Sequence, residues 1–229
     1  MQQLLVGGLA ASAVPSVARA ADAPPRPDAF EPLSAWLDAE QPPATTYDTS
    51  WTSRLTGKYK AVFDVPEING GSGVWRAGLW VNHYTDVLKA QPTDLSPVIV
   101  IRHTAIPLIM SHEFWDRYDV AKAHKVRHPM TNKKTRRNPV LMTVADDQLP
   151  AMFAKLTLDE QMKRGAVVVA CGMAFSSMTQ LVVERDKLKG AEARAKALSM
   201  VAPGVIMQPN GIFGVTLAQH HGCVFVAAS

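Results

Sequence analysis

Five short apolar runs recur along the chain, and polar, helix-forming segments separate them. The runs cover residues 59–65 (YKAVFDV), 98–103 (VIVIRH), 166–172 (AVVVACG), 205–209 (VIMQP) and 223–228 (CVFVAA). Runs of this kind predict buried strands, whereas apolar residues near helical spacing predict helices between them. The segments expected to be helical are 74–90, 107–118, 156–164, 176–201 and 211–222.

Strands and helices therefore alternate along most of the chain. Near-continuous apolar strands joined by helical crossovers are typical of a parallel sheet that is covered on both faces. The sequence thus predicts an α/β fold, with a five-stranded, mainly parallel sheet and helices on both faces.

Composition divides the chain into three regions. Residues 1–20 form a signal-like segment, residues 21–56 a Pro-rich arm or linker, and residues 57–229 the α/β domain. Within that domain, residues 119–150 interrupt the alternation of strands and helices, beginning with a basic stretch over 119–139 that shows little apolar periodicity. We expect this part to be an insertion loop.

The first region has features of an export signal. Residues 4–18 are apolar, small and uncharged, and Ala18-Arg19-Ala20 supplies the small-x-small pattern that signal peptidases accept. Its Gly and Ala content resembles a twin-arginine export signal. The run is short for a membrane span, which needs about 20 residues. We therefore expect an exported, periplasmic protein; an uncleaved leader that anchors the chain to a membrane and a fraying apolar helix are the alternatives.

The formal net charge of +4 is modest, but its distribution is uneven. Seven cations fall in the insertion with no acid between them: Lys122, Lys125, Arg127, Lys133, Lys134, Arg136 and Arg137. We expect this stretch to dock on an acidic protein partner or on an anionic membrane surface, or else to be a solvated loop. Residues 119–140 lack interleaved aromatic side chains, so we expect no nucleic-acid binding.

Cys171 is the residue on which any chemical interpretation depends. It follows the run AVVVA at the carboxyl end of a predicted strand, which is where ligands of parallel sheets bind. A helix start and a nearby cation would favour a nucleophilic thiolate there, and the alternative is a small buried hydrophobe. Cys223 begins the last strand, about 17 Å from the carboxyl edge, so we expect no disulfide and a core position for Cys223.

Two residues at the end of the second predicted strand are candidate partners of Cys171. His103 is a candidate base that deprotonates the thiol, or a hydrogen-bonded strand-end histidine. Arg102 is a candidate anion ligand, or the salt-bridge partner of Asp64 or Glu67.

Backbone groups supply the remaining candidates. The turn at Asn69 and Gly70 is a candidate anion cradle before the next helix, or a simple tight turn, since it lacks the spacing of known phosphate-binding loops. Gly172 and the amides that follow it are candidates for stabilising a Cys171 anion. The histidines lack zinc-ligand spacing, and two cysteines are too few for a disulfide scaffold. We expect no metal and no cofactor.

The carboxyl-terminal part resembles the DsrE/DsrF-like sulfur-relay family. The resemblance rests on RGAVVVACGMAF at 164–175 and on the order of features over 202–229, namely Pro203-Gly204-Val205, Gly211 and the Gln219–Gly222 turn into the last strand. The first two strand–helix units are similar in layout, and His103 matches a histidine at the end of the family's second strand. The resemblance covers roughly residues 58–118 and 156–229.

The resemblance implies a five-stranded parallel sheet, a homotrimer or homohexamer, and a persulfide carried on Cys171. Two hypotheses about function follow from the sequence. In the first, an exported DsrE-like protein handles sulfane sulfur or a small ligand at a strand-end cysteine pocket, as a persulfide carrier or sulfurtransferase-like enzyme. In the second, the chain is a non-catalytic binding or assembly module attached to a membrane-associated complex.

Overall fold

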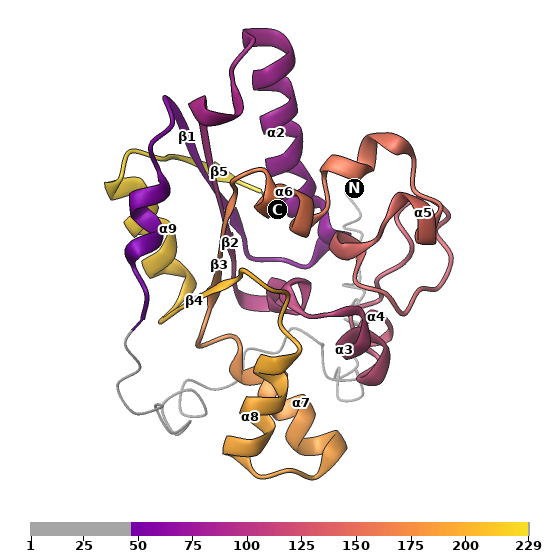
Figure 1. Cartoon of the computed structure of the whole chain (residues 1–229). Helices are drawn as coiled ribbons and strands as arrows, with labels where there is room; N and C mark the ends of the chain where they lie inside the picture. Colours follow the sequence, from indigo (N-terminus) through magenta and orange to yellow (C-terminus); the bar gives the residue numbers. More distant parts are fainter. Residues whose placement is uncertain (1–46, 229) are drawn as a thin grey trace, which may run out of the picture. The chain divides into compact units, whose positions relative to one another are not determined.

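The computed structural model describes residues 47–228; the predicted signal-like segment and most of the Pro-rich arm lie outside this range. The described residues form one five-stranded, all-parallel sheet with helices on both faces (Figure 1). The predicted fold class is therefore confirmed.

The five strands coincide with the five apolar runs, and they pair out of sequence order. They are β1 (Tyr59–Val65), β2 (Leu95–Ile101), β3 (Val167–Cys171), β4 (Ile206–Gln208) and β5 (Val224–Ala227). The order across the sheet is β4-β3-β2-β1-β5. The chain thus adds strands in one direction from β1 to β4, and then crosses the whole sheet to place β5 beside β1.

Helices and short 3-10 segments connect the strands. The α-helices of the described part are α2 (Ser72–Leu88), α3 (His112–Arg117), α4 (Val120–Ala123), α5 (Val144–Asp147), α6 (Leu158–Lys163), α7 (Ser176–Asp186), α8 (Gly190–Ser199) and α9 (Gly211–His220). The 3-10 segments are η1 (Ser50–Arg54), η2 (Asn69–Gly71), η3 (Pro92–Asp94), η4 (His103–Ile109), η5 (Pro139–Leu141) and η6 (Ala151–Lys155). The helix expected over 107–118 is divided between η4 and α3, and the helical stretch over 176–201 forms α7 and α8.

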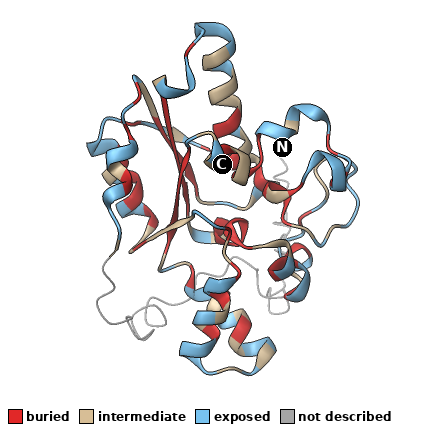
Figure 2. Cartoon of the chain, viewed as in Figure 1, coloured by how far each residue is buried: buried red, intermediate tan, exposed pale blue. Residues whose placement is uncertain are grey.

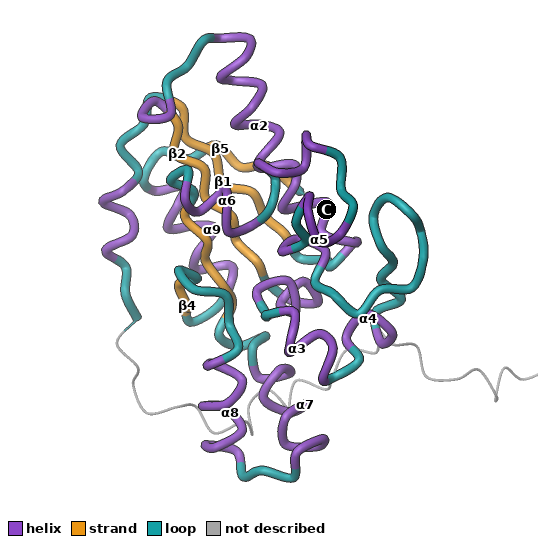
Figure 3. The backbone as a smooth tube through the Cα atoms, turned by 45° about the vertical axis from the view of Figure 1, so that its right-hand side comes forward, coloured by secondary structure: helices purple, strands orange, loops and turns teal. Residues whose placement is uncertain are grey.

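The inner strands β1, β2 and β3 bury both of their faces, which explains why they are apolar at nearly every position, whereas the edge strand β5 is mostly exposed. Successive side chains of a strand point to opposite faces. Phe63 and Ile99 pack with α2 on one face, whereas Val62 and Val98 pack with η1 and α9 on the other. The strands lie between the helices in Figure 3, and their residues form most of the buried centre in Figure 2.

Strand β2 begins earlier than the sequence predicts. The expected start was Val98, because proline is rare inside sheets, yet the strand runs from Leu95 through Pro97. Pro97 pairs with Ala61 of β1, and pairing with β3 begins only at Val98. At Pro97, β2 is therefore paired with β1 alone. Because β3 is not paired there, the N–H that proline lacks removes no hydrogen bond between β2 and β3.

The described end of the arm is part of the folded domain. Trp51 of η1 is only 1% exposed and packs against the core between the sheet and α9. The backbone oxygen of Asp48 accepts a hydrogen bond from Gln208 of β4 at 2.6 Å. The expected boundary at residue 57 therefore falls within structured chain.

The insertion contains little regular structure, as predicted. Apart from the short helices α4 and α5 and the turn η5, it has an isolated antiparallel bridge between Arg127 and Lys134. Between residues 47 and 228, no helix combines the length and the apolar character that crossing a membrane requires.

Candidate functional site

At the carboxyl edge of the sheet, the connections that follow β3 and β4 run to opposite faces of the sheet. The segment after β3 leads into α7, whose Met178 and Val182 share a core cluster with Val74 of α2. The segment after β4 leads into α9, whose Val215 lies in the core cluster of the other face. Ligands of parallel sheets bind at such a point, where neighbouring connections diverge.

Cys171 ends β3 at this edge. It is a free thiol, and 7% of its surface is exposed. Its Sγ accepts a hydrogen bond from the backbone N–H of Ala174 at 3.4 Å, while its carbonyl oxygen accepts one from Phe175 at 3.0 Å. The turn after β3 therefore folds over the sulfur, and little of the residue is exposed.

The backbone amide of Gly172 does not surround the sulfur as the sequence predicts. It donates to the carbonyl oxygen of Gln208 at 2.8 Å, and the Met173 amide donates to that of Pro209 at 3.2 Å. Pairing of β3 with β4 thus continues beyond both strands. A side chain at position 172 would place its Cβ 2.7 Å from the Gln208 oxygen, so only glycine fits this close approach.

Arg102, the residue directly after β2, is level with Cys171. Ile101 pairs with Ala170, so the next residue of each strand lies at the same height. The Arg102 guanidinium forms two hydrogen bonds with the carboxylate of Asp64, at 2.7 and 2.8 Å. Of the two salt-bridge partners that the sequence suggests, Asp64 and Glu67, the structure shows Asp64. Hydrogen bonding to Asp64 is the main cause that raises the pKa of Arg102; burial opposes it, and Cys171 adds a smaller electrostatic contribution.

The start of α9 lies directly over Arg102. A Cβ added to Gly211 would come within 2.4 Å of the Arg102 Cβ, so the helix approaches this closely only because residue 211 is glycine. The Asn210 side chain caps the helix by accepting a hydrogen bond from the Phe213 amide at 2.8 Å. The ion pair is consequently held between the sheet and the first turn of α9.

His103 lies one residue farther along the chain than the level of Cys171. It is exposed, begins η4 and has a φ of 51°, in the left-handed region. Its role as a base for Cys171 stays a prediction.

The turn at Asn69 and Gly70 is not brought to Cys171. It follows β1, and β2 separates β1 from β3, so two strand spacings, about 10 Å, lie between them. The turn therefore does not belong to the Cys171 edge, and its role as an anion cradle before α2 stays a prediction.

Gln208 is a polar residue of this edge that the sequence analysis missed. It pairs with Cys171, is fully buried, and its Nε2 donates to the backbone oxygens of Asp48 and Met207. Its Oε1 is buried with no hydrogen-bond partner within the described chain. The signal available in the sequence was a glutamine in a strand that otherwise reads as apolar.

Cys223 provides an internal comparison for Cys171. It is 6% exposed, belongs to the core cluster beneath α9 and is a free thiol, so it forms no disulfide with Cys171, as predicted. Burial raises the pKa of Cys223 to about 11, and the charge of Lys60 opposes this shift only in part. No cluster of three or more potential metal ligands occurs among residues 47–228.

The cations of the insertion fall into two groups. Arg136 pairs with Asp116 and Asp119, and Arg137 pairs with Asp147, whose side chain is only 4% exposed. The lysines, in contrast, are exposed and have no acidic partner in the described part of the chain; they are Lys122, Lys125, Lys133 and Lys134. Arg136 and Arg137 therefore hold the insertion in place. The four lysines leave a positive surface together with Arg127, which is exposed and donates to the Asn132 carbonyl oxygen.

Comparisons with family models, with curated proteins and with solved structures found no match. The resemblance to the DsrE/DsrF-like family thus rests on the sequence features quoted above.

Proposed function

We propose that Cys171 is an acceptor thiol for sulfane sulfur from a small donor. The observation that carries this proposal is the position of Cys171 at the end of an inner parallel strand, where the connections diverge, with an amide hydrogen bond to its sulfur. The amide hydrogen bond and the positive charge of Arg102 can both stabilise negative charge that develops on the sulfur during a reaction.

The reaction is a transfer between sulfur atoms. The Cys171 thiolate attacks the terminal sulfur of a hydropersulfide, RSSH. A new S–S bond forms as the original one breaks, which gives Cys–S–SH and the leaving thiolate RS⁻. The proton that Cys171 first loses goes to a base, for which His103 is the candidate. Because 7% of the residue is exposed, the donor is of low molecular weight.

Incubation with glutathione hydropersulfide should add about 32 Da, one sulfur atom, to the protein in mass spectrometry. We expect the adduct to disappear in Cys171→Ser and to persist in Cys223→Ser, because burial keeps the Cys223 thiol protonated. An adduct that survives Cys171→Ser, or its absence from the unaltered protein, contradicts the proposal.

The proposal extends to the assembly and location of the protein. A DsrE-like chain with this sheet would form a homotrimer or homohexamer, and the signal-like segment over residues 1–20 would export it to the periplasm. The support is the family resemblance and the pattern of the leader.

A second candidate function is attachment to an anionic membrane surface through the insertion. The four unpaired lysines favour it, and Met130, 47% exposed, lies between the bridged residues Arg127 and Lys134. Basic side chains around an exposed apolar residue fit an anionic lipid headgroup layer.

Replacing the four lysines at 122, 125, 133 and 134 with glutamine should reduce co-sedimentation with phosphatidylglycerol vesicles by about tenfold or more. The matched control removes the same charge at exposed lysines elsewhere, namely Lys58, Lys89, Lys187 and Lys189, and should retain most binding. Equal losses in both variants would show a general charge effect. Binding to polyglutamate but not to vesicles would point to an acidic protein instead.

A further inference from the structure

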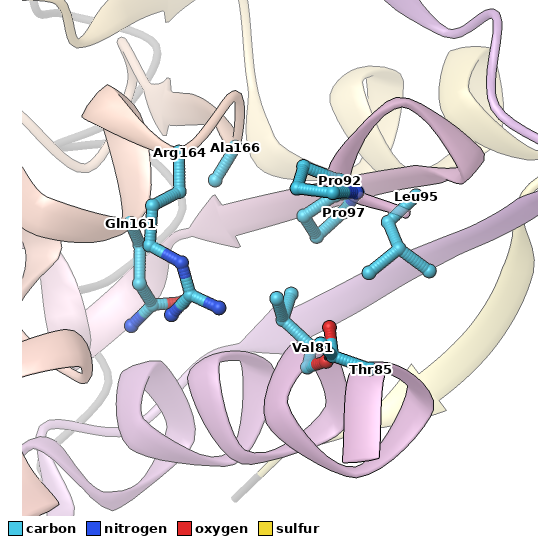
Figure 4. A pocket seen from close by; sticks show the side chains of 8 residues that line it. All are labelled: Val81, Thr85, Pro92, Leu95, Pro97, Gln161, Arg164 and Ala166. Carbon is cyan, nitrogen blue, oxygen red and sulfur yellow. The ribbon is translucent and has the colours of Figure 1, made fainter. Parts of the chain in front are cut away.

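A small cavity opens at the amino-terminal edge of the sheet, far from Cys171. Its volume is ≈ 90 Å³, and Figure 4 shows the side chains around it. Val81 of α2, Leu95 and Pro97 of β2, and Ala166 just before β3 supply an apolar wall. Five residue steps along β3 separate Ala166 from Cys171, about 17 Å, so the cavity is independent of the thiol.

The polar end of the cavity is formed by Arg164 and Gln161 (Figure 4). The Arg164 guanidinium donates to the carbonyl oxygen of Lys155 at 3.2 Å and to Oδ1 of Asn82 at 3.1 Å. Both acceptors are neutral, and no carboxylate pairs with Arg164 in the described chain. Arg102, Arg117, Arg136 and Arg137, in contrast, all pair with carboxylates. Arg164 therefore keeps its positive charge uncompensated.

Gln161 adds a hydrogen-bond acceptor beside this charge. It is 2% exposed, and its Nε2 donates to the carbonyl oxygens of Val74 and Leu156 at 2.9 and 2.7 Å. Those two bonds fix the orientation of the amide, because a flipped amide would face oxygen toward oxygen. Oε1 is left buried with no partner among the described residues, although buried acceptors are normally satisfied.

A surface groove of ≈ 350 Å³ adjoins the cavity, and Thr85 and Arg164 line both. Lys155 and Asp86 also line the groove. The formal charges of Arg164, Lys155 and Asp86 sum to +1. The groove thus gives an anionic group a path from solvent to the guanidinium.

We propose that the cavity binds a short-chain 2-hydroxycarboxylate. The carboxylate accepts hydrogen bonds from Arg164, the hydroxyl donates to Gln161 Oε1 after a small side-chain adjustment, and the alkyl tail lies against Val81, Leu95 and Pro97. The small volume of the cavity, ≈ 90 Å³, favours a short alkyl tail such as the ethyl group of 2-hydroxybutanoate.

The proposal is tested by saturation-transfer NMR and calorimetry with 2-hydroxybutanoate on the full chain. Butanoate, which lacks the hydroxyl, should bind roughly three- to tenfold more weakly, and butane-1,2-diol, which lacks the charge, roughly tenfold or more. Equal affinity of the acid and the diol would overturn the assignment of Arg164, and absence of saturable binding would overturn the site.

Variants of the protein separate the two ends of the cavity. Arg164→Gln should weaken binding of 2-hydroxybutanoate about tenfold or more, and Val81→Phe, from a half-buried position, should block the tail. The matched control is Arg127→Gln, which should bind as the unaltered protein does. Among the described residues, the exposed Arg127 guanidinium bonds only the Asn132 carbonyl oxygen. Circular dichroism checks that each variant is folded. Unchanged binding in both cavity variants would contradict the proposal.

Discussion

Replacing Asn138 with leucine is expected to lower the free energy of unfolding by about 3–5 kcal/mol. Asn138 is fully buried, and its Nδ2 donates to the carbonyl oxygens of Leu108 and Met110 at 2.8 and 2.7 Å. Its Oδ1 accepts from the Val140 amide at 3.2 Å. Leucine has nearly the same shape but leaves two carbonyl oxygens and one N–H without partners, and each such group costs about 1–3 kcal/mol.

The position of Asn138 makes this loss larger than that of an isolated hydrogen bond. Its backbone N–H donates to Nδ1 of His112 at 3.0 Å, and the other ring nitrogen of His112 bonds the Leu141 carbonyl oxygen. Burial is the main cause that lowers the pKa of His112, which keeps the ring neutral and able to accept. Asn138 and His112 together fasten the end of the basic stretch to η4 and α3.

Urea denaturation followed by fluorescence measures the effect of Asn138→Leu. Asn210→Ala serves as the graded control, because it removes only the cap of α9 and should cost about 1 kcal/mol. If Asn138→Leu were no more destabilising than Asn210→Ala, the fastening role of Asn138 would be wrong.

The inner strands β1, β2 and β3 could be predicted because burial on both faces requires their apolar runs. A parallel sheet with two covered faces needs apolar side chains at nearly every strand position, so the pattern is visible locally. The start of β2 was the exception. Pro97 can lie within β2 because only β1 is paired with β2 at that position. This pairing depends on distant parts of the chain, so the local sequence does not reveal it.

The composition of the site was less predictable than its location. The strand end at Cys171 follows from the sequence, but the side chains level with it depend on register between strands. Arg102 rather than His103 shares that level, because Ile101 pairs with Ala170. Gln208 was missed because a single glutamine in an apolar strand is a weak signal, and its buried oxygen without a partner among the described residues is visible only in the structure.

The insertion shows the same limit for charged residues. The sequence identifies seven cations without an acid between them, and they read as one basic surface. Arg136 and Arg137 instead reach acids that flank the stretch, Asp116 and Asp147 among them, and so become structural. The four lysines and Arg127, which the sequence does not set apart, retain the surface role.

Replacing Arg102 with methionine is expected to have two effects. It leaves the carboxylate of Asp64, whose side chain is 10% exposed, without its cation, and should lower the free energy of unfolding by about 2–3 kcal/mol. It also removes the positive charge level with Cys171, and should slow alkylation of that thiol by iodoacetamide roughly threefold at neutral pH. Alkylation is followed by mass spectrometry in a Cys223→Ser background, so that one thiol reacts.

Two controls separate the charge of Arg102 from a general loosening of the fold. Arg136→Met breaks a pair of similar length, 2.7 Å to Asp116, but both side chains are more than 60% exposed, so it should cost less than about 1 kcal/mol. Asp64→Asn leaves the Arg102 cation without its counter-charge and should therefore speed alkylation of Cys171. Loosening of the fold would speed the reaction in both site variants, whereas the charge of Arg102 should slow it in Arg102→Met and speed it in Asp64→Asn. Alkylation that is not slowed in an Arg102→Met protein shown to be folded would contradict the role of Arg102.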